Sequence, residues 1–310
     1  QNARAGTREQ GLFAAGWWRG RIQAMRLLTI LLLAALASTP AAAQSPWIIA
    51  PPTGIVQLGT FQDSTLSESS AAAASRRQPG VIWTLNDSGN SPWVYAVDTA
   101  GHALGTFRVM GASNFDWETL TISPCPAGSC LIIGDTGDNP ELRPSVTLYR
   151  VPEPKVAASA AGVLTPTAPA ESLSIRYPDG PHDVEAIYAD SSGDVYFVSK
   201  GRSKGILLFR LPASAWVAGG AAVPEFVDSL PIVPNISIGH WVSDAAISPD
   251  GRHVAVRTYS AVFFFTVGTA GRLTPDRGRE CFFGLLEPQG EGITWLDNRR
   301  LLLTSEASST

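Results

Sequence analysis

The apolar residues of this chain fall in short runs rather than at helical spacing. Runs rich in Val, Ile, Leu, Phe, Trp and Thr, such as 81–85, 195–198 and 261–265, are separated by turn residues, with 29 glycines and 23 prolines in the whole chain. Short runs of β-branched and aromatic residues bounded by Gly and Pro are typical of β-strands. The sequence therefore predicts an all-β fold.

A repeated pattern divides most of the chain into five similar units. Each unit opens with a carboxylate, continues with small and apolar residues, and reaches a turn and a second apolar strand. The opening carboxylates are Glu68, Glu118, Glu185, Asp244 and Glu291, which lie 50, 67, 59 and 47 residues apart. Repeats of about 40–50 residues are typical of propeller blades, which are antiparallel sheets of four strands. The pattern predicts a β-propeller with five blades, and six blades is the alternative.

Three segments do not fit the repeat directly. The fifth unit ends at Thr310, just past its second strand, so we expect a C-terminally incomplete last blade. The apolar run 54–61 precedes the first unit, and we expect it to supply the outer strand of the last blade. The low-complexity segment 155–170 is interpreted as a loop insertion, and 216–224 resembles it.

The N-terminal region has the pattern of an export signal. Arg26 precedes an apolar run at 27–37, and three alanines at 41–43 resemble a cleavage site before Gln44. The apolar run is shorter than the roughly 20 residues that span a bilayer. We therefore expect residues 1–24 to be a non-native extension and 25–43 a cleaved signal peptide. Residues 44–310 would then be a single propeller domain, periplasmic or secreted from a bacterium, with no membrane span.

Charge and cysteine content narrow the function classes. The net charge of −4 and the absence of a basic stripe argue against a nucleic-acid partner. Cys125 and Cys130 flank a turn-rich Pro-Ala-Gly-Ser segment, and in an oxidising compartment this spacing predicts a local disulfide. Cys281, beside Phe282, is interpreted as a small apolar residue rather than a nucleophile. We expect the exported protein to be a monomer.

The geometry of a four-stranded meander predicts where the repeated carboxylates lie. The start of its first strand and the end of its second share one edge, because antiparallel neighbours reverse direction. The five opening carboxylates should therefore surround one channel mouth, together with the residues that end the second strands. These are Asn86, Asp87, Asp135, Lys200, Arg257 and Glu306. Asp116 and Asp183 precede Glu118 and Glu185 by two positions, which in a strand places each pair on the same side.

This concentration of acids suggests a bound cation. Neighbouring carboxylates raise one another's pKa unless they are neutralised, and oxygen ligands without clustered His or Cys favour Ca²⁺. The candidate metal ligands are Asp116, Glu118, Asp183 and Glu185. Lys200 and Arg257 interrupt the acidic pattern, either as ion-pair partners of Glu185 and Asp244 or as a clamp for an anionic ligand. His182 and His240 precede acidic segments but are expected to be ordinary loop or strand residues.

Four strings resemble a known group of proteins. They are Trp-Thr-Leu-Asn-Asp-Ser-Gly at 83–89, Asp-Trp-Glu-Thr-Leu at 116–120, Gly-Asp-Thr-Gly-Asp-Asn at 134–139 and Asp-Val-Glu-Ala-Ile at 183–187. The chain resembles uncharacterised secreted bacterial β-propellers over residues 62–306. These are similar to SdiA-regulated (YjiK-like) propellers and more distantly to phytase-like and SMP-30-like calcium propellers. The resemblance implies calcium near Glu68, Asp87, Asp116, Glu118, Asp135, Asp183, Glu185 and Glu291. The chain lacks the run of adjacent acids of propeller phytases, which argues against phytate as a substrate.

Three functions follow from these expectations. The first is an exported calcium-binding propeller that binds a small or anionic molecule as a scaffold, with ligand-binding residues Glu68, Asp87, Asp135, Asp244, Glu291 and Glu306. The second is a metal-dependent hydrolase of a phosphoester, lactone or ester. In it, Lys200 and Arg257 would hold the anion while Glu118 or Glu185 activates water. The third is a platform for protein interaction.

Overall fold

The computed structural model describes residues 54–306 apart from 158–159, 285–286 and 288. In these residues the regular structure consists of 20 β-strands and three 3-10 turns, η1 (Ala213–Ala215), η2 (Ile236–Ile238) and η3 (Thr269–Gly271). The predicted all-β fold is confirmed. The expected N-terminal extension at 1–24 and the expected signal peptide at 25–43 lie outside the described residues.

Four sheets of at least four strands follow one another along the chain. The first contains β1 (Ser69–Ala74), β2 (Ile82–Asn86), β3 (Trp93–Val97) and β4 (Ala103–Met110). The second contains β5 (Trp117–Ser123), β6 (Cys130–Asp135), β7 (Val146–Pro152) and β9 (Glu171–Ile175). The third contains β10 (Val184–Ala189), β11 (Val195–Ser199), β12 (Ile206–Leu211) and β14 (Glu225–Leu230). The fourth contains β15 (Val242–Ile247), β16 (His253–Thr258), β17 (Ala261–Val267) and β18 (Leu273–Phe282). A two-stranded sheet of β19 (Gln289–Trp295) and β20 (Leu301–Glu306) follows them.

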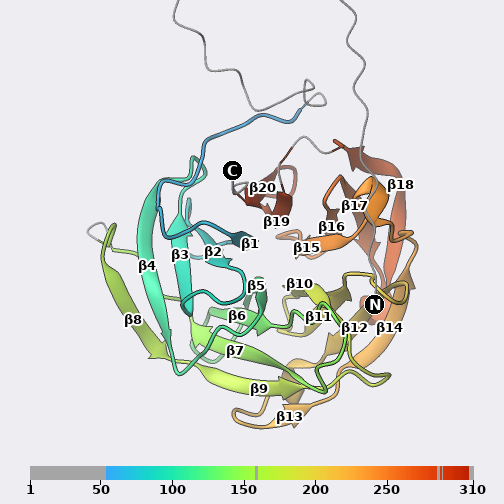
Figure 1. Cartoon of the computed structure of the whole chain (residues 1–310), viewed down its shortest axis with the longest axis horizontal. Helices are drawn as coiled ribbons and strands as arrows, with labels where there is room; N and C mark the ends of the chain where they lie inside the picture. Colours follow the sequence, from blue (N-terminus) through green and yellow to red (C-terminus); the bar gives the residue numbers. More distant parts are fainter. Residues whose placement is uncertain (1–53, 158–159, 285–286, 288, 307–310) are drawn as a thin grey trace, which may run out of the picture. The chain divides into compact units, whose positions relative to one another are not determined.

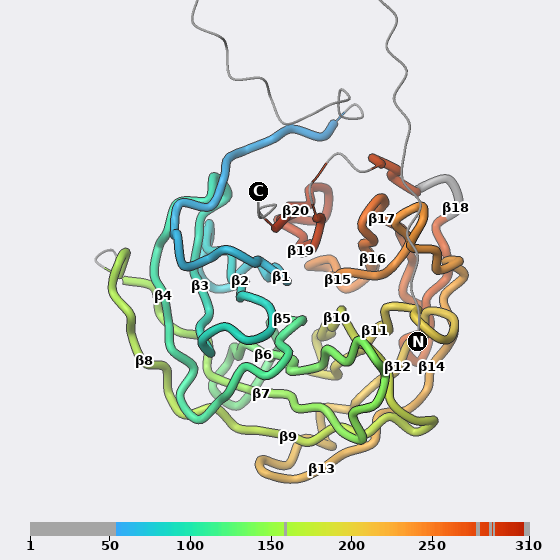
Figure 2. Tube along the Cα trace, in the orientation of Figure 1, coloured from blue at the N-terminus to red at the C-terminus, as the bar shows by residue number. Residues whose placement is uncertain are grey.

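The sheets are arranged around one axis as in a β-propeller (Figure 1). The first strands β1, β5, β10, β15 and β19 are neighbours in that cyclic order, and β19 also contacts β1. The Cα trace shows the same five strands innermost and β4, β9, β14 and β18 farther out (Figure 2). The described residues therefore form four complete blades, and each begins with its innermost strand, as the repeat predicted.

Small residues allow the inner strands to approach closely. The β1 residues 71–74 are all alanines and all buried. At Gly292 in β19, an added Cβ would lie 2.8 Å from the backbone of Ala71 and 2.4 Å from Thr304 Oγ1. A larger side chain there would push β19 away from β1, so glycine is required where the last sheet meets the first.

The two low-complexity segments are not merely loops. In the first, β8 (Leu164–Pro169) pairs in parallel with β4 and adds a fifth strand to the first sheet. In the second, β13 (Ala221–Ala222) pairs in parallel with β9 of the second sheet. Both strands form for the same reason. The outer edge of a sheet offers unpaired N–H and C=O groups, and an extended segment that lies beside the edge can hydrogen-bond to them. Composition alone does not reveal such pairing.

The segment 54–61 does not form the expected strand of the last sheet. No strand is assigned to these residues. Ile55 does pack against the apolar cluster that contains Ile293 and Trp295 of that sheet, but the backbone continues toward the first sheet, where Gln62 N–H donates to Gly101 O at 3.0 Å. This bond to the β3–β4 turn fixes the end of the segment to the first sheet. Among the described residues the last sheet therefore has two strands.

The core lies between neighbouring sheets, where side chains from adjacent blades interdigitate. Trp83 of the first sheet and Trp117 of the second are both fully buried in one cluster, and similar clusters join the other sheets. A disulfide joins Cys125 and Cys130 across the β5–β6 turn, with Cα atoms 5.9 Å apart. Cys281 is a free, half-buried thiol. Within the described part of the chain, no helix has the length and apolar character that crossing a membrane requires.

Candidate functional site

A β-bulge interrupts every innermost strand near its start. The pairing register with the second strand shifts between Ser69 and Ala71, Trp117 and Thr119, Val184 and Ala186, Val242 and Asp244, and Gly290 and Ile293. In each inner strand, the first residue left without a partner by this shift is the bulge residue. These are Ser70, Glu118, Glu185, Ser243 and Glu291. A bulge re-aims the side chain of its extra residue. Because all five bulges lie at the same end of the inner strands, these residues form one layer around the axis.

A second layer lies beside the first and comes from the second strand of each sheet. It consists of the residue that directly follows the partner of the last residue before the bulge. The register places Asn86, Asp135, Ser199, Thr258 and Ser305 opposite the residues that precede the bulges. The next residues along the chain are Asp87, Thr136, Lys200, Tyr259 and Glu306. We refer to the two layers together as the channel mouth. Three of its members were named from the sequence as strand-end residues, namely Asp87, Lys200 and Glu306.

Lys200 neutralises part of the acidic layer. Its ammonium lies 2.8 Å from Glu185 Oε1, and both side chains are buried. Burial lowers the pKa of Lys200, but the nearby Glu185 carboxylate and Tyr259 outweigh it, so the pKa is above its usual value. Burial raises the pKa of Glu185 to about 7 even though Lys200 acts in the opposite direction. The pair therefore holds one positive charge and one acid that titrates near neutrality.

Glu118 and Glu291 lie in the same layer as Glu185, and their surroundings also disfavour the ionised form. Burial and then the Glu185 carboxylate raise the pKa of Glu118 well above its usual value and raise that of Glu291 to about 8. Ser70 Oγ donates to Glu118 Oε2 at 2.8 Å, and Ser243 Oγ donates to the backbone oxygen of Glu291 at 3.1 Å. The two serines thus link neighbouring bulges. Three buried carboxyls around one ammonium leave the mouth acidic.

Three carboxylates form a cluster that fits a cation. Asp87, Asp116 and Glu118 each offer an oxygen within 4.8 Å of the others. Burial and then Asp87 raise the pKa of Asp116 to about 6. At Gly137 a Cβ would lie 2.5 Å from the Asp116 carboxylate, so this glycine leaves room for the acid. Close carboxylate oxygens are ligands that a hard cation such as Ca²⁺ prefers.

Two predicted acids are held by arginines instead. Asp183 forms an ion pair with Arg202 and accepts the N–H of Asp138 at 2.9 Å. Asp135 lies 2.8 Å from Arg143 and accepts the N–H of Phe115. Of the four predicted metal ligands, Asp116 and Glu118 therefore lie together with Asp87. Asp183 and Glu185 are occupied by Arg202 and Lys200.

Arg257 and Asp244 lie below the mouth and do not pair as expected. Arg257 is fully buried, and its guanidinium donates to Glu287 at 2.6 Å and to the backbone oxygens of Gly292 and Thr304. It is thus committed to holding β19 and β20 and is not free to clamp an anion. Asp244 Oδ2 accepts N–H groups from Ala72 on the first sheet and from Ile293 on the last sheet. Burial raises the pKa of Asp244 well above its usual value, although these donors oppose the shift.

Glu68 and the histidines lie outside the two layers. Glu68 is exposed and its Oε2 accepts Asn90 Nδ2 at 2.6 Å, although it still influences the pKa of Glu306. His182 is buried, hydrogen-bonds Asp179 at 2.7 Å and packs against Tyr177. His240 packs edge-on against Phe263. Both histidines therefore have ordinary structural surroundings.

Four residues of the channel mouth were not predicted from the sequence, namely Ser70, Ser243, Thr136 and Tyr259. The first two are the bulge residues of sheets in which the pattern selected Glu68 and Asp244 instead. Tyr259 follows the second strand of the fourth sheet as Lys200 follows that of the third, two positions after the selected Arg257. The residues at the mouth could have been found from the position where each second strand ends, rather than from the nearest charged residue. An error of one or two residues in locating that end therefore changes which side chain is expected at the mouth.

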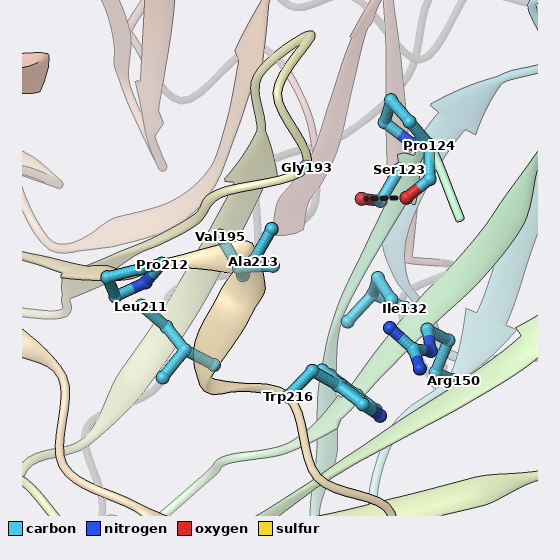
Figure 3. A pocket seen from close by; sticks show the side chains of 10 residues that line it. All are labelled: Ser123, Pro124, Ile132, Arg150, Gly193, Val195, Leu211, Pro212, Ala213 and Trp216. Carbon is cyan, nitrogen blue, oxygen red and sulfur yellow. Dashed lines mark hydrogen bonds between the residues drawn. The ribbon is translucent and has the colours of Figure 1, made fainter. Parts of the chain in front are cut away.

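A separate small cavity lies between the second and third sheets at the opposite end (Figure 3). Its volume is about 20 Å³, which holds at most about one water. Arg150 stacks 4.3 Å from the centre of the Trp216 ring, and both side chains contact Glu171. Its polar groups are already paired, so this cavity is not a candidate ligand site.

No family model matches this chain, and no curated protein matches it. Among solved structures, the PQQ-bound aldose sugar dehydrogenase of Streptomyces coelicolor is similar with a TM-score of 0.45 and 11% identity, covering 83% of this chain and 94% of that one. The periplasmic gluconolactonase PpgL of Pseudomonas aeruginosa is similar with a TM-score of 0.39 and 14% identity, covering 73% and 60%. Hydrazine synthase of Kuenenia stuttgartiensis is similar with a TM-score of 0.38 and 13% identity, covering 77% and 55%. This chain thus spans less than two thirds of the length of the last two structures.

Proposed function

We propose that this protein is a calcium-binding β-propeller that binds a small molecule at its channel mouth. The observation that carries the proposal is the cluster of Asp87, Asp116 and Glu118, whose oxygens lie within 4.8 Å of one another. Burial and mutual repulsion raise the pKa values of Asp116 and Glu118, so a divalent cation would stabilise their ionised forms. One face of the ion would remain open to a ligand from solvent, because Asp87 and Asp116 are only half-buried.

Calorimetric titration of the chelator-treated full chain with CaCl₂ tests the proposal. The wild type is expected to bind one Ca²⁺, and Asp116→Asn is expected to weaken binding about ten-fold or more, because a charged ligand is lost. Asp297→Asn is the matched control, since Asp297 is an exposed acid at the β19–β20 turn, at the other end of the sheets. Absence of Ca²⁺ binding by the folded wild type, or equal affinity in Asp116→Asn, would contradict the proposal.

A second candidate function is metal-dependent hydrolysis of an ester, lactone or phosphoester. The observation that favours it is Glu185, a buried acid whose pKa is raised to about 7 in the layer that also holds Glu118. A carboxylate with such a pKa suits general-base activation of water at neutral pH. A screen of aryl esters, lactones and phosphoesters tests this idea. Turnover that requires Ca²⁺ and is lost in Glu185→Gln supports it, whereas turnover insensitive to both excludes it.

We also propose that the two-stranded sheet is the inner half of a fifth blade rather than part of a six-bladed ring. The support is that β19 contacts both β15 and β1, which leaves no place for a further inner strand. An experimental structure with another sheet between β19 and β1 would exclude this count.

Export follows from the signal pattern at 25–43 and would place the protein in the periplasm or outside the cell. A mature N-terminus other than Gln44 in the exported protein would contradict the predicted cleavage. Light scattering is expected to show a monomer.

A further inference from the structure

An open groove lies on the flank of the second and third sheets, at the same end of these sheets as the channel mouth but lined by different residues. It has a volume of about 570 Å³, within the range of about 300–1,000 Å³ that is usual for small-molecule sites. Its walls come from the β6–β7 loop, the β9–β10 connection and the segment after β13. Leu142, Pro144, Pro178, Pro181 and Val223 contribute most of the apolar surface.

The walls are rigid and poor in polar groups. Three prolines restrict the backbone and offer no N–H donors. Tyr177 is buried beneath the groove, where its ring packs against His182, Phe197 and Phe209. The Tyr177 hydroxyl is buried without a hydrogen-bond partner within the described residues, and burial and then the Asp183 carboxylate raise its pKa. The groove is therefore largely preformed and presents mainly apolar surface.

One charged side chain lines the groove. Arg176 is exposed at the end of β9, and its backbone N–H is fixed by a 3.1 Å bond to Ala222 O. No carboxylate pairs with its guanidinium within the described residues. Asp179, which lies close by in sequence, is bound by Lys204 and His182. A guanidinium without an acid partner beside an apolar surface suits a ligand with one anionic group.

The apolar side chains beside Arg176 are unusually open to solvent. Leu142 is 75% exposed and Val223 is 50% exposed. Covering such side chains removes apolar area from water and favours binding, as in other exposed apolar patches with a function. An apolar chain with a carboxylate head would cover Leu142 and Val223 while its head pairs with Arg176.

We propose that this groove binds a medium-chain aliphatic carboxylate, with the head on Arg176 and the chain against Leu142 and Val223. This site is separate from the calcium site and does not depend on the proposed function. The expected head-group contact is the two-bonded pairing that guanidinium and carboxylate groups commonly form. The prolines provide the fixed walls that hold the chain in one orientation.

Calorimetry of the full chain with sodium octanoate tests the proposal. The wild type is expected to bind one octanoate, and Arg176→Ala is expected to weaken binding about ten-fold or more, since a charge-assisted hydrogen-bonded pair is lost. Arg176→Lys should retain part of the affinity because it keeps the charge. Arg108→Ala is the matched control, because Arg108 is an equally exposed arginine on β4 that lies outside the groove.

Two further measurements separate the head from the chain. 1-Octanol should bind the wild type more weakly than octanoate and be unaffected by Arg176→Ala. Leu142→Asp should weaken both ligands. Lack of saturable octanoate binding by the folded wild type, unchanged affinity in Arg176→Ala, or an equal loss in Arg108→Ala would each overturn the proposal. Loss of octanoate binding in Asp116→Asn with no loss in Arg176→Ala would also overturn it, because the ligand would then occupy the mouth.

Discussion

Glu118, Glu185 and Glu291 show how a buried side chain acquires unusual chemistry from its surroundings. Each is almost fully buried, where desolvation disfavours the ionised form, and the Glu185 carboxylate acts on both Glu118 and Glu291. Lys200 is the ammonium that acts on all three. One cation cannot neutralise three carboxylates, so part of the layer stays protonated at neutral pH or binds another cation. Protonation of these carboxyls and binding of a cation at the mouth therefore compete.

Glu291 should make stability depend on pH. Its pKa is raised from the ordinary 4.5 to about 8, so between these values the unfolded chain has lost a proton that the folded chain retains. The stability that this proton supplies is fully present below pH 4.5 and is lost as the pH rises through 8. In chelator, the free energy of unfolding should therefore fall by up to about 1.4 kcal/mol per pH unit for this group. Urea unfolding at several pH values measures it.

Glu291→Gln removes this titration and should flatten the pH dependence. Glu225→Gln is the control, because Glu225 is exposed and, among the described side chains, pairs only with Arg210 at 3.5 Å. A wild-type stability that rises between pH 5 and 8, or an equal slope in Glu291→Gln, would show that Glu291 titrates normally. Added Ca²⁺ should reduce the slope of the wild type if the cation binds the same layer.

At the scale of elements, loops and edges join the blades as much as the core does. The strands β8 and β13 each extend the outer edge of a sheet, and the turns at the end opposite the mouth carry side-chain bonds between sheets. Glu153, just after β7, is the clearest case. Its carboxylate accepts hydrogen bonds from four side chains, namely those of Ser75, Gln78, Trp83 and Ser129. Three of these donors belong to the first sheet or its β1–β2 turn, so Glu153 links two blades.

Glu153→Ala should destabilise the protein by about 1–3 kcal/mol, because partly buried donors lose their acceptor. Burial raises the pKa of Glu153, but the four hydrogen bonds outweigh it and lower the pKa overall. Its contribution is therefore present at neutral pH and is lost as the pH falls through the lowered value. Urea unfolding at pH 7 and pH 4 measures both effects. An exposed control, Glu225→Ala, should change stability little, and equal stability of Glu153→Ala and wild type would refute the link.

At the scale of the whole molecule, Asp244 joins three sheets near the axis. It lies on β15 of the fourth sheet and accepts backbone N–H groups from β1 and β19 at 3.3 and 2.8 Å. Arg257 reinforces the same junction through the backbone oxygens of Gly292 and Thr304. Charged side chains therefore hold the place where the last sheet meets the first. This explains why neither residue is free at the mouth.

Asp244→Ala should weaken the closure of the ring. It leaves the N–H groups of Ala72 and Ile293 without their acceptor, at a cost of about 1–3 kcal/mol for each unpaired buried group. Hydrogen exchange should accelerate first in β1 and β19, with the third sheet less affected. Asp250→Ala, which removes an exposed acid from the β15–β16 turn, is the control. Uniform acceleration in all sheets, or none, would show that Asp244 does not act at this junction.

The fold class and the repeat could be predicted from the order of the amino acids alone. Strand-length apolar runs between turn residues predict β-structure whatever the tertiary context, and a repeat marks each new blade because each must begin a similar sheet. The repeat also predicts correctly that Glu118, Glu185 and Glu291 lie at the same level along the axis. The disulfide between Cys125 and Cys130 could also be predicted, because its two cysteines are only five positions apart and flank one short turn.

The tertiary structure decided which side chains face the mouth and which pair with one another. Side chains in a strand alternate between faces, and one bulge residue reverses that alternation, so the error from Glu68 to Ser70 or from Asp244 to Ser243 was invisible in the pattern. The partners Arg143, Arg202 and Glu287 come from loops distant in sequence, and no local signal connects them to their acids. Register and loop placement, rather than residue type, therefore selected the three carboxylates that we propose bind calcium.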